Sequence, residues 1–157
     1  YDADDLFEKY SWMMREAIKN RPNDMVIGMH MCRGNFRSTH AAAGSYEAAA
    51  EAIFSTGVDI FFMEYDTERA GGFEPLRFAP PKTTVVLGLV SSKLAKMEQK
   101  DDLKRRVEEA AQYVPIENMC ISPQCGFASM AVGNLISEDD QWRKLELCAE
   151  TAAEIWG

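Results

Sequence analysis

Short apolar runs alternate regularly along the chain with segments of helical periodicity. Four runs are apolar at nearly every position and too short for helices, which predicts strands at residues 25–32, 59–65, 83–90 and 118–122. Apolar residues recur every three or four positions between and beyond these runs, which predicts helices at residues 6–18, 46–55, 101–113 and 137–155. The last helix is expected to begin at Ser137, because Asp140 follows three residues later as in a capping box.

Strands that are apolar on both faces and separated by helices predict an α/β fold with a parallel sheet built from βαβ units. Four such strands allow two architectures. One is a small open sheet, and the other is half of a (βα)8 TIM barrel, which needs eight strands to close without exposed edges. Nothing in the sequence marks a domain boundary, so residues 1–157 are predicted to form a single domain. The Gly- and Pro-rich segment 70–81 is predicted to be a long loop.

Composition excludes several classes of function. The formal net charge of -8 disfavours binding to nucleic acid or to an anionic membrane, since both require clustered Lys and Arg. No apolar run reaches the roughly 18 residues of a membrane helix, and the N-terminus lacks the plan of a signal peptide, so a cytoplasmic location is expected. Four irregularly spaced cysteines in such a protein favour metal binding or catalysis over a disulfide framework.

Residues that can bind a metal lie at the C-terminal ends of three predicted strands. His30 and Cys32 are two apart on the first strand, so their side chains point to the same side. Glu64 ends the second strand, and Cys125 follows the fourth. Barrels and open α/β sheets place their sites at these ends. One imidazole, two thiols and a carboxylate suit zinc best among the common metals.

Each of these residues also has a simpler interpretation. A single H-x-C pair is a weak signal, Glu64 can form a salt bridge with Arg69, and Cys125 can be an unreactive turn cysteine. The joint occurrence at successive strand ends is what favours zinc.

The other cysteines and the second histidine have different predicted roles. Cys148 lies on the apolar stripe of the last helix and is predicted to be in the core. Cys120 lies within the fourth strand and is predicted to pack in a barrel interior or under a helix. His40 lies in a polar loop and is predicted to be at the surface, where it is the only spare histidine for acid–base chemistry.

Three segments together resemble the zinc-site segments of the cobalamin-independent methionine synthase superfamily. They are residues 30–36 (HMCRGNF), 62–66 (FMEYD) and 122–127 (SPQCGF), and they occur in the order found in that family. Residues 85–93 also resemble the corresponding strand of its shorter, single-barrel members. The resemblance implies that the chain is the C-terminal half of a (βα)8 barrel. It also implies that His30, Cys32, Glu64 and Cys125 bind Zn²⁺, and that the zinc binds an acceptor thiol.

The sequence departs from the family pattern in two ways. Only the C-terminal half of the catalytic barrel is matched, and the parts that usually hold the amino-acid end of homocysteine and the folate lie upstream of it. Full-length family members also carry a histidine, a proposed proton donor, just after the strand matched by residues 83–90. Here that place is taken by Ser91, Ser92 and Lys93. The resemblance therefore leaves the methyl donor and the acid catalyst open.

The function implied is that of a zinc-dependent thiol S-methyltransferase, which activates a homocysteine-like thiol and makes methionine with a methyl-folate donor. Two thiolates, a carboxylate, a neutral imidazole and Zn²⁺ sum to a formal charge of about -1, which favours thiolate alkylation over the water activation typical of three-His sites. Alternatives are a zinc alkyltransferase that uses another thiol or a corrinoid methyl donor, and a non-catalytic zinc-stabilised fragment or subunit. The expected partners are the thiol, a folate-like donor, and either the missing N-terminal half of the barrel or a self-associated copy.

Overall fold

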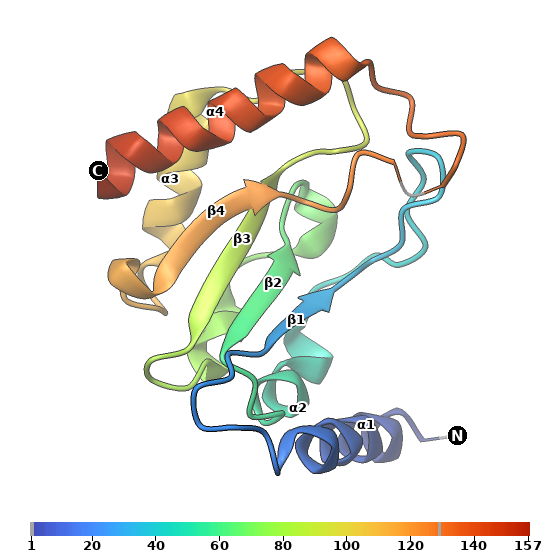
Figure 1. Ribbon diagram of the computed structural model, residues 1–157, viewed down its shortest axis with the longest axis vertical. Coiled ribbons are helices and arrows are strands. Elements are labelled where there is room, and N and C mark those ends of the chain that lie inside the picture. The colour runs from blue at the N-terminus through green and yellow to red at the C-terminus, as the bar shows by residue number, and fades with distance from the viewer. Residues whose placement is uncertain (1, 129) are drawn as a thin grey trace.

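The computed structural model describes residues 2–128 and 130–157 and contains one sheet of four parallel strands. The strands are β1 (Gly28–Met31), β2 (Ile60–Glu64), β3 (Thr84–Val90) and β4 (Met119–Pro123), and their order in the sheet is their order in the sequence (Figure 1). A doubly wound sheet would reverse direction at a switch point, whereas successive units of a βα barrel add strands on one side only. The prediction of four parallel strands alternating with helices is confirmed.

Helices connect and flank the strands at the predicted positions. They are α1 (Ala3–Ile18), α2 (Ala50–Phe54), α3 (Lys100–Ala110) and α4 (Glu138–Trp156), with short 3-10 helices η1 (Glu47–Ala49), η2 (Glu68–Ala70), η3 (Glu74–Phe78) and η4 (Ile116–Asn118). The predicted loop 70–81 thus contains the short helix η3. Ser137 caps α4 as expected, because its Oγ accepts a hydrogen bond from the Asp140 amide at 3.1 Å. No helix among the described residues is long and apolar enough to cross a membrane.

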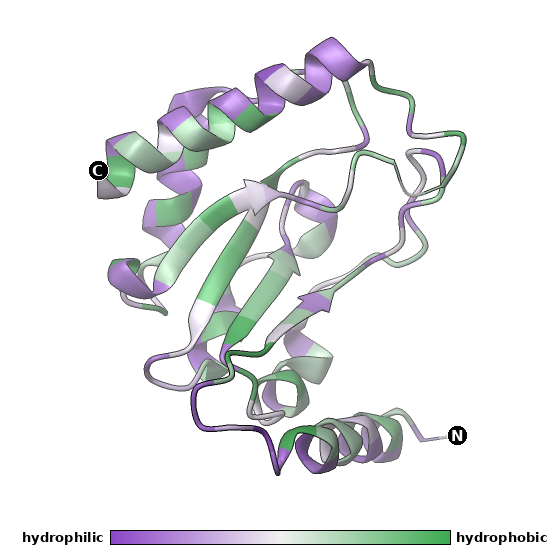
Figure 2. Cartoon of the chain, viewed as in Figure 1, coloured by the Kyte–Doolittle hydropathy of each residue, from purple (hydrophilic) through white to green (hydrophobic). Residues whose placement is uncertain are grey.

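The hydrophobic core lies between the helices and one face of the sheet. Figure 2 shows apolar residues concentrated on the strands and polar residues on the outer sides of the helices. Strand residues that point toward the helices are almost fully buried: Phe61, Met63, Val85, Leu87 and Met119. They alternate with residues of the opposite face, as the two-residue repeat of a strand requires.

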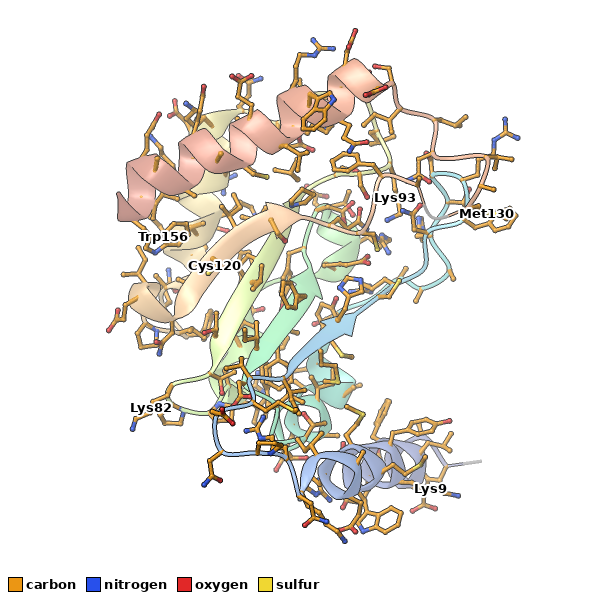
Figure 3. The ribbon with its side chains drawn as sticks, viewed as in Figure 1. Lys9, Lys82, Lys93, Cys120, Met130 and Trp156 are labelled. Carbon is orange, nitrogen blue, oxygen red and sulfur yellow. The ribbon has the colours of Figure 1, made fainter. Side chains whose placement is uncertain are left out.

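The opposite face of the sheet is left open. His30, Phe62, Val86 and Cys120 form one row across the four strands, since their backbones are paired in register. Phe62 is 39% exposed, and Cys120 is exposed as well. The prediction that Cys120 packs in an interior was therefore wrong for this chain: the residue points to a sheet face that no described element covers (Figure 3).

The first strand is shorter than predicted because β1 is an edge strand. Met25 and Val26 were expected to belong to it, but they are 49% and 67% exposed and precede the first ladder residue. The chain is instead anchored through Asp59, whose carboxylate accepts hydrogen bonds from Arg21 and, at 2.8 Å, from the amide of Ile27. These bonds align the entry to β1 with the entry to β2.

Candidate metal centre

The four predicted metal ligands come together at the C-terminal ends of the strands. His30 lies near the end of β1, Cys32 directly follows it, Glu64 is the last residue of β2, and Cys125 lies in the turn after β4. One donor atom from each residue lies within 4.8 Å of every other. Residues separated by up to 95 positions thus converge, because parallel strands end at the same edge of the sheet.

Three of the separations between donor atoms fit a tetrahedral zinc ion. Zinc bonds of about 2.3 Å to sulfur and about 2.0–2.1 Å to nitrogen place two sulfurs about 3.8 Å apart, and a sulfur and a nitrogen about 3.6 Å apart. The Sγ atoms of Cys32 and Cys125 are 3.8 Å apart, and Cys125 Sγ is 3.6 Å from His30 Nε2. His30 Nε2 is 3.5 Å from Glu64 Oε1, near the value of about 3.4 Å for a nitrogen and an oxygen on one zinc ion.

Cys125 and Glu64 are in direct contact. The thiol of Cys125 donates a hydrogen bond to Glu64 Oε1 at 2.5 Å, closer than two ligands of one zinc ion can lie. Burial and this carboxylate raise the pKa of Cys125, which holds the thiol protonated. Burial also tends to raise the pKa of Glu64, but hydrogen bonds from Cys125 and Gln124 outweigh it, and the net shift is downward. Metal binding would therefore have to displace the thiol proton and separate the two groups.

Two buried residues that the sequence did not single out position Glu64. The hydroxyl of Tyr46 accepts a hydrogen bond from the Glu64 amide at 3.0 Å and lies 3.3 Å from the carbonyl oxygens of both Met31 and Glu64, so it joins the ends of β1 and β2. Burial raises the pKa of Tyr46 to about 12, which keeps the hydroxyl proton available for these bonds. Gln124 donates from Nε2 to Glu64 Oε2 at 2.7 Å and fixes the carboxylate from the side of β4. Such partners orient ligands in metal sites.

The loop after β1 brings Cys32 to the cluster. The amide of Gly34 donates to Cys32 Sγ at 3.3 Å. Gly34 has a φ of 86°, and a Cβ there would lie 2.6 Å from Ala41, so the tight turn requires glycine. Asn35 then donates from Nδ2 to the carbonyl of Gly126 at 3.1 Å, which links this loop to the turn that carries Cys125.

An irregularity in the sheet lies beside Glu64. Gly88 pairs with Glu64 on one side and Ser122 on the other, and the register between β3 and β4 shifts between Gly88 and Val90. A Cβ at Gly88 would lie 3.0 Å from the carbonyl oxygen of Met63 and 3.1 Å from Cα of Gln124. The glycine therefore allows the two ligand-bearing strands to approach β3 closely.

The structure also tests the simpler interpretation of Glu64 and the predicted places of Cys148 and His40. Arg69 lies 3.9 Å from Glu64 Oε2 but only 3.3 Å from Asp66, so it is mainly the partner of Asp66. Cys148 is buried in the core and His40 is exposed, as predicted. His40 is not among the clustered donors.

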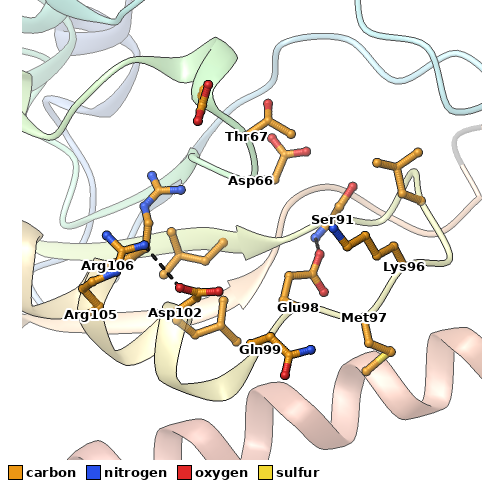
Figure 4. Close-up of a pocket in the computed structure, with 14 residues that line it drawn as sticks. Asp66, Thr67, Ser91, Lys96, Met97, Glu98, Gln99, Asp102, Arg105 and Arg106 are labelled. Carbon is orange, nitrogen blue, oxygen red and sulfur yellow. Dashed lines mark hydrogen bonds and ion pairs between the residues drawn. The ribbon is translucent and has the colours of Figure 1, made fainter.

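A cavity of about 460 Å³ lies nearby, between the segment after β2 and the start of α3 (Figure 4). Its lining includes Asp66, Ser91 and Glu98 and the paired side chains of Asp102 and Arg105. None of the four clustered donors lines it. The charged side chains that line it are of both signs, and Asp102 and Arg105 form an ion pair, so the cavity is separate from the cluster of donors.

Comparisons with known proteins show the family to which the chain belongs. The family described as "Cobalamin-independent synthase, Catalytic domain" matches residues 7–139. The chain belongs to this family. Two relatives from Bacillus subtilis (strain 168) are Uncharacterized protein YxjG, 48% identical over 155 residues, and Uncharacterized protein YxjH, 46% identical over 157 residues. These alignments cover 98% and 99% of this chain but only 41% and 42% of the relatives.

Solved structures match the whole fold of this family member. A putative vitamin-B12 independent methionine synthase from Listeria monocytogenes has a TM-score of 0.78 and 39% identity, and the match covers 100% of this chain and 43% of that one. A B12-independent methionine synthase from Shewanella sp. W3-18-1, solved in complex with selenomethionine, has a TM-score of 0.74 at 17% identity, covering 94% of this chain and 44% of that one. The second match concerns the fold alone. The chain thus spans about two fifths of the length of the relatives that it matches.

Proposed function

We propose that this chain contributes the zinc-binding half of a thiol S-methyltransferase that acts on a homocysteine-like acceptor and forms methionine. The observation that carries the proposal is the convergence of His30, Cys32, Glu64 and Cys125, whose donor atoms lie within 4.8 Å of one another, in a member of the cobalamin-independent synthase family. The proposed donor is a methyl-folate, with a corrinoid donor or another thiol acceptor as the alternative within the same chemistry.

The donor set itself argues for alkyl transfer. Zinc bound by these residues would keep a coordinated acceptor thiol deprotonated, and only the thiolate attacks carbon well. Two cysteine ligands and a carboxylate supply more negative charge than a three-His set, so the acceptor sulfur would stay nucleophilic. The protein residues orient this set: Tyr46 and Gln124 hold Glu64, and the loop after β1 presents Cys32.

We further propose that residues 1–157 form a single half-barrel domain whose open face is covered by further polypeptide. The apolar side chain of Phe62 and the thiol of Cys120 are exposed on that face, and both edges of the sheet lack partners within the described residues. An eight-stranded barrel would cover the face and remove both edges. The cover is proposed to be the other half of the barrel or, as an alternative, a second copy of this chain.

Replacing Cys125 with Ala tests the metal assignment. We expect Cys125→Ala to abolish tight zinc binding, because one of four ligands and one negative charge are lost. Cys120→Ala is the matched control: it removes a thiol from β4, outside the cluster, and should leave the metal content unchanged. One equivalent of zinc retained by Cys125→Ala would show that the ligand assignment is wrong.

Cobalt substitution distinguishes a catalytic site from a structural one. In a non-catalytic module all four positions stay filled by protein, and the spectrum does not respond to thiols. We expect homocysteine to change the cobalt spectrum, since the acceptor must enter the coordination sphere. An unchanged spectrum at saturating homocysteine would support the structural alternative.

A further inference from the structure

Buried polar atoms without a hydrogen-bond partner are concentrated just after the C-terminal ends of the strands. Among the described residues seven such side-chain atoms occur, and all belong to residues within five positions after the end of a strand: Arg33, Asn35, Tyr65, Thr67, Ser92, Lys93 and Gln124. Native folds leave few buried polar groups unpartnered, and those that remain call for a ligand, a water molecule or an ion. The C-terminal end of the sheet thus offers polar atoms that could bind a ligand, in addition to the four candidate metal donors.

Lys93 is the most unusual of these groups because its one charged nitrogen has no partner, whereas Arg33 donates from its second terminal nitrogen to the carbonyl of Gly44. Its residue is only 6% exposed, and its Nζ atom has no hydrogen-bond partner or ion pair among the described residues. Burying an ammonium without a partner costs desolvation free energy, which an anion bound beside it would offset. The backbone holds the residue firmly, since the Lys93 amide donates to Ser91 Oγ at 3.2 Å and the Ser92 carbonyl accepts from Asn134 at 3.0 Å.

The position of Lys93 directs its charge to the cluster. The residue follows β3, the strand between the Glu64-bearing β2 and the Cys125-bearing β4, and Figure 3 shows it at the end of the sheet to which the strand arrows point. Burial raises the pKa of Asp66, and the charge of Lys93 is the largest opposing influence. The same charge also acts on Glu64. The place of Lys93 after β3, between the strands that lead to Glu64 and Cys125, puts its charge on the same edge of the sheet as the four donors.

The buried charges around the centre leave an excess of positive charge. Outside the four donors, the charged side chains at these strand ends that are at most 10% exposed are three cations, Arg33, Arg69 and Lys93, and one carboxylate, Asp66. Arg69 is paired with Asp66, and Arg33 donates to the carbonyl of Gly44 and lies over the ring of Tyr46. A centre of two thiolates, one carboxylate and Zn²⁺ has a formal charge of about -1, which offsets one of the two remaining positive charges. One positive charge is left, and an acceptor that enters as a monoanion would neutralise it.

We propose that Lys93 is the cation that binds the acceptor thiol in its thiolate form beside the four predicted metal ligands. The inference rests on the proposed function, because it requires that the acceptor enters this centre. On binding, the S–H bond of the acceptor breaks and its proton goes to solvent. The sulfur keeps the electron pair, and the ammonium of Lys93 stays protonated. Lys93 thus favours the reactive form of the acceptor.

Several titratable groups share the end of the sheet with Lys93. Those just after the ends of the neighbouring strands, and in the segment before α3, are His30, Cys32, Arg33, Glu64, Asp66, Arg69, Glu98 and Cys125. Glu98 is already bound to Lys144 and to the amide of Ser91, so it does not neutralise Lys93.

The test measures homocysteine binding to the cobalt-substituted protein, made with the polypeptide that completes its barrel. The readout is the thiol-dependent spectrum, followed over about pH 7 to 9, where a free thiol titrates. We expect Lys93→Met to weaken homocysteine binding about 10- to 100-fold near neutral pH, the value of one hydrogen bond to a charged group. The pH midpoint for binding should rise by about one to two units. Lys93→Arg should bind as the parent does.

Lys96→Met is the matched control. It removes the same charge from an exposed side chain three residues away and should leave homocysteine binding unchanged. Metal content is measured for every variant, and Lys93→Gln provides a second neutral replacement that keeps a hydrogen-bond donor.

The outcomes separate the two proposals. No thiol-dependent spectrum in the parent would overturn the proposed function and this inference with it. A response in the parent that is unchanged in Lys93→Met would overturn this inference alone. Loss of bound metal in both neutral variants would also overturn it, because Lys93 would then support the fold or the metal rather than the acceptor.

Discussion

A buried ion pair between α4 and the segment after β3 gives the sharpest prediction about stability. Lys144 is fully buried, and its ammonium donates to Glu98 Oε2 at 2.8 Å and to the carbonyl of Lys96 at 2.7 Å. Glu98 Oε1 in turn accepts from the amide of Ser91 at 2.9 Å. One ammonium therefore joins the last helix to the segment between β3 and α3, which contains Lys93.

The cost of Lys144→Met follows from what the substitution leaves behind. Methionine keeps most of the apolar stem but removes both hydrogen bonds, so a carboxylate and a carbonyl lose their partner. Removing one partner of a buried ion pair costs about 3–5 kcal/mol. The side chain of Glu98 is 19% exposed, so water can partly replace the ammonium, and the low end of that range applies. We expect a loss of about 3 kcal/mol in the free energy of unfolding.

Urea denaturation of the parent and the variant measures this loss. Lys100→Met is the matched control, since Lys100 also joins α3 to α4 through Glu150 and Glu154, but these pairs lie at the surface and should contribute little. Adding Glu98→Gln to Lys144→Met should recover part of the stability, because the unpaired charge is removed. A loss below about 1 kcal/mol for Lys144→Met, equal to that of a surface pair, would refute the reasoning.

Three further predictions concern the site and its supports. Gly88→Ala should leave the fold intact but weaken zinc binding about 10- to 100-fold, as loss of a supporting contact does. The reason is that the new methyl group would press on both strands that lead to candidate ligands. A metal titration measures the affinity, and an unchanged value would contradict the prediction. Hydrogen bonding to Arg21 lowers the pKa of Asp59, so this carboxylate should stabilise the fold above its unfolded pKa of about 3.9. Melting curves should show Asp59→Asn less stable at neutral pH, and the difference from the parent should vanish as the pH falls through the lowered pKa. In the isolated chain, a maleimide should label the exposed thiol of Cys120 but should not label Cys148 until the protein unfolds. Cys148 is protected because burial raises the pKa of its thiol to about 12. Mass spectrometry of the labelled peptides shows which cysteine reacts first.

The sequence predicted the fold well because each element carries its own local pattern. Strands β2, β3 and β4 begin and end within one residue of the predicted positions, since apolar runs and the turns around them are local signals. The first strand was predicted too long because Met25 and Val26 are apolar but exposed. An edge strand pairs on one side only, and its length depends on contacts, such as those of Asp59, that no local pattern reveals.

The candidate site was predictable for a different reason. In a parallel sheet every strand ends at the same edge, so residues able to bind a metal at strand ends are brought together without any knowledge of side-chain contacts. The residues that orient them were missed. Tyr46 looks like one more apolar position on a helical stripe, and only the structure shows its hydroxyl between Met31 and Glu64. Gln124 could have been noticed as the polar residue beside Cys125.

Whether Cys120 is buried could not be predicted from this sequence alone. The alternation of β4 places it on the face opposite the helices, in one row with Phe62 and Val86. Whether that face is buried depends on polypeptide that packs against it, and the described residues include none. The four predicted ligands lie at the end of the same face, where one donor atom of each lies within 4.8 Å of every other. Residues of this chain therefore suffice to bring the candidate ligands together, whereas burial of Phe62 and Cys120 depends on contacts outside the described residues.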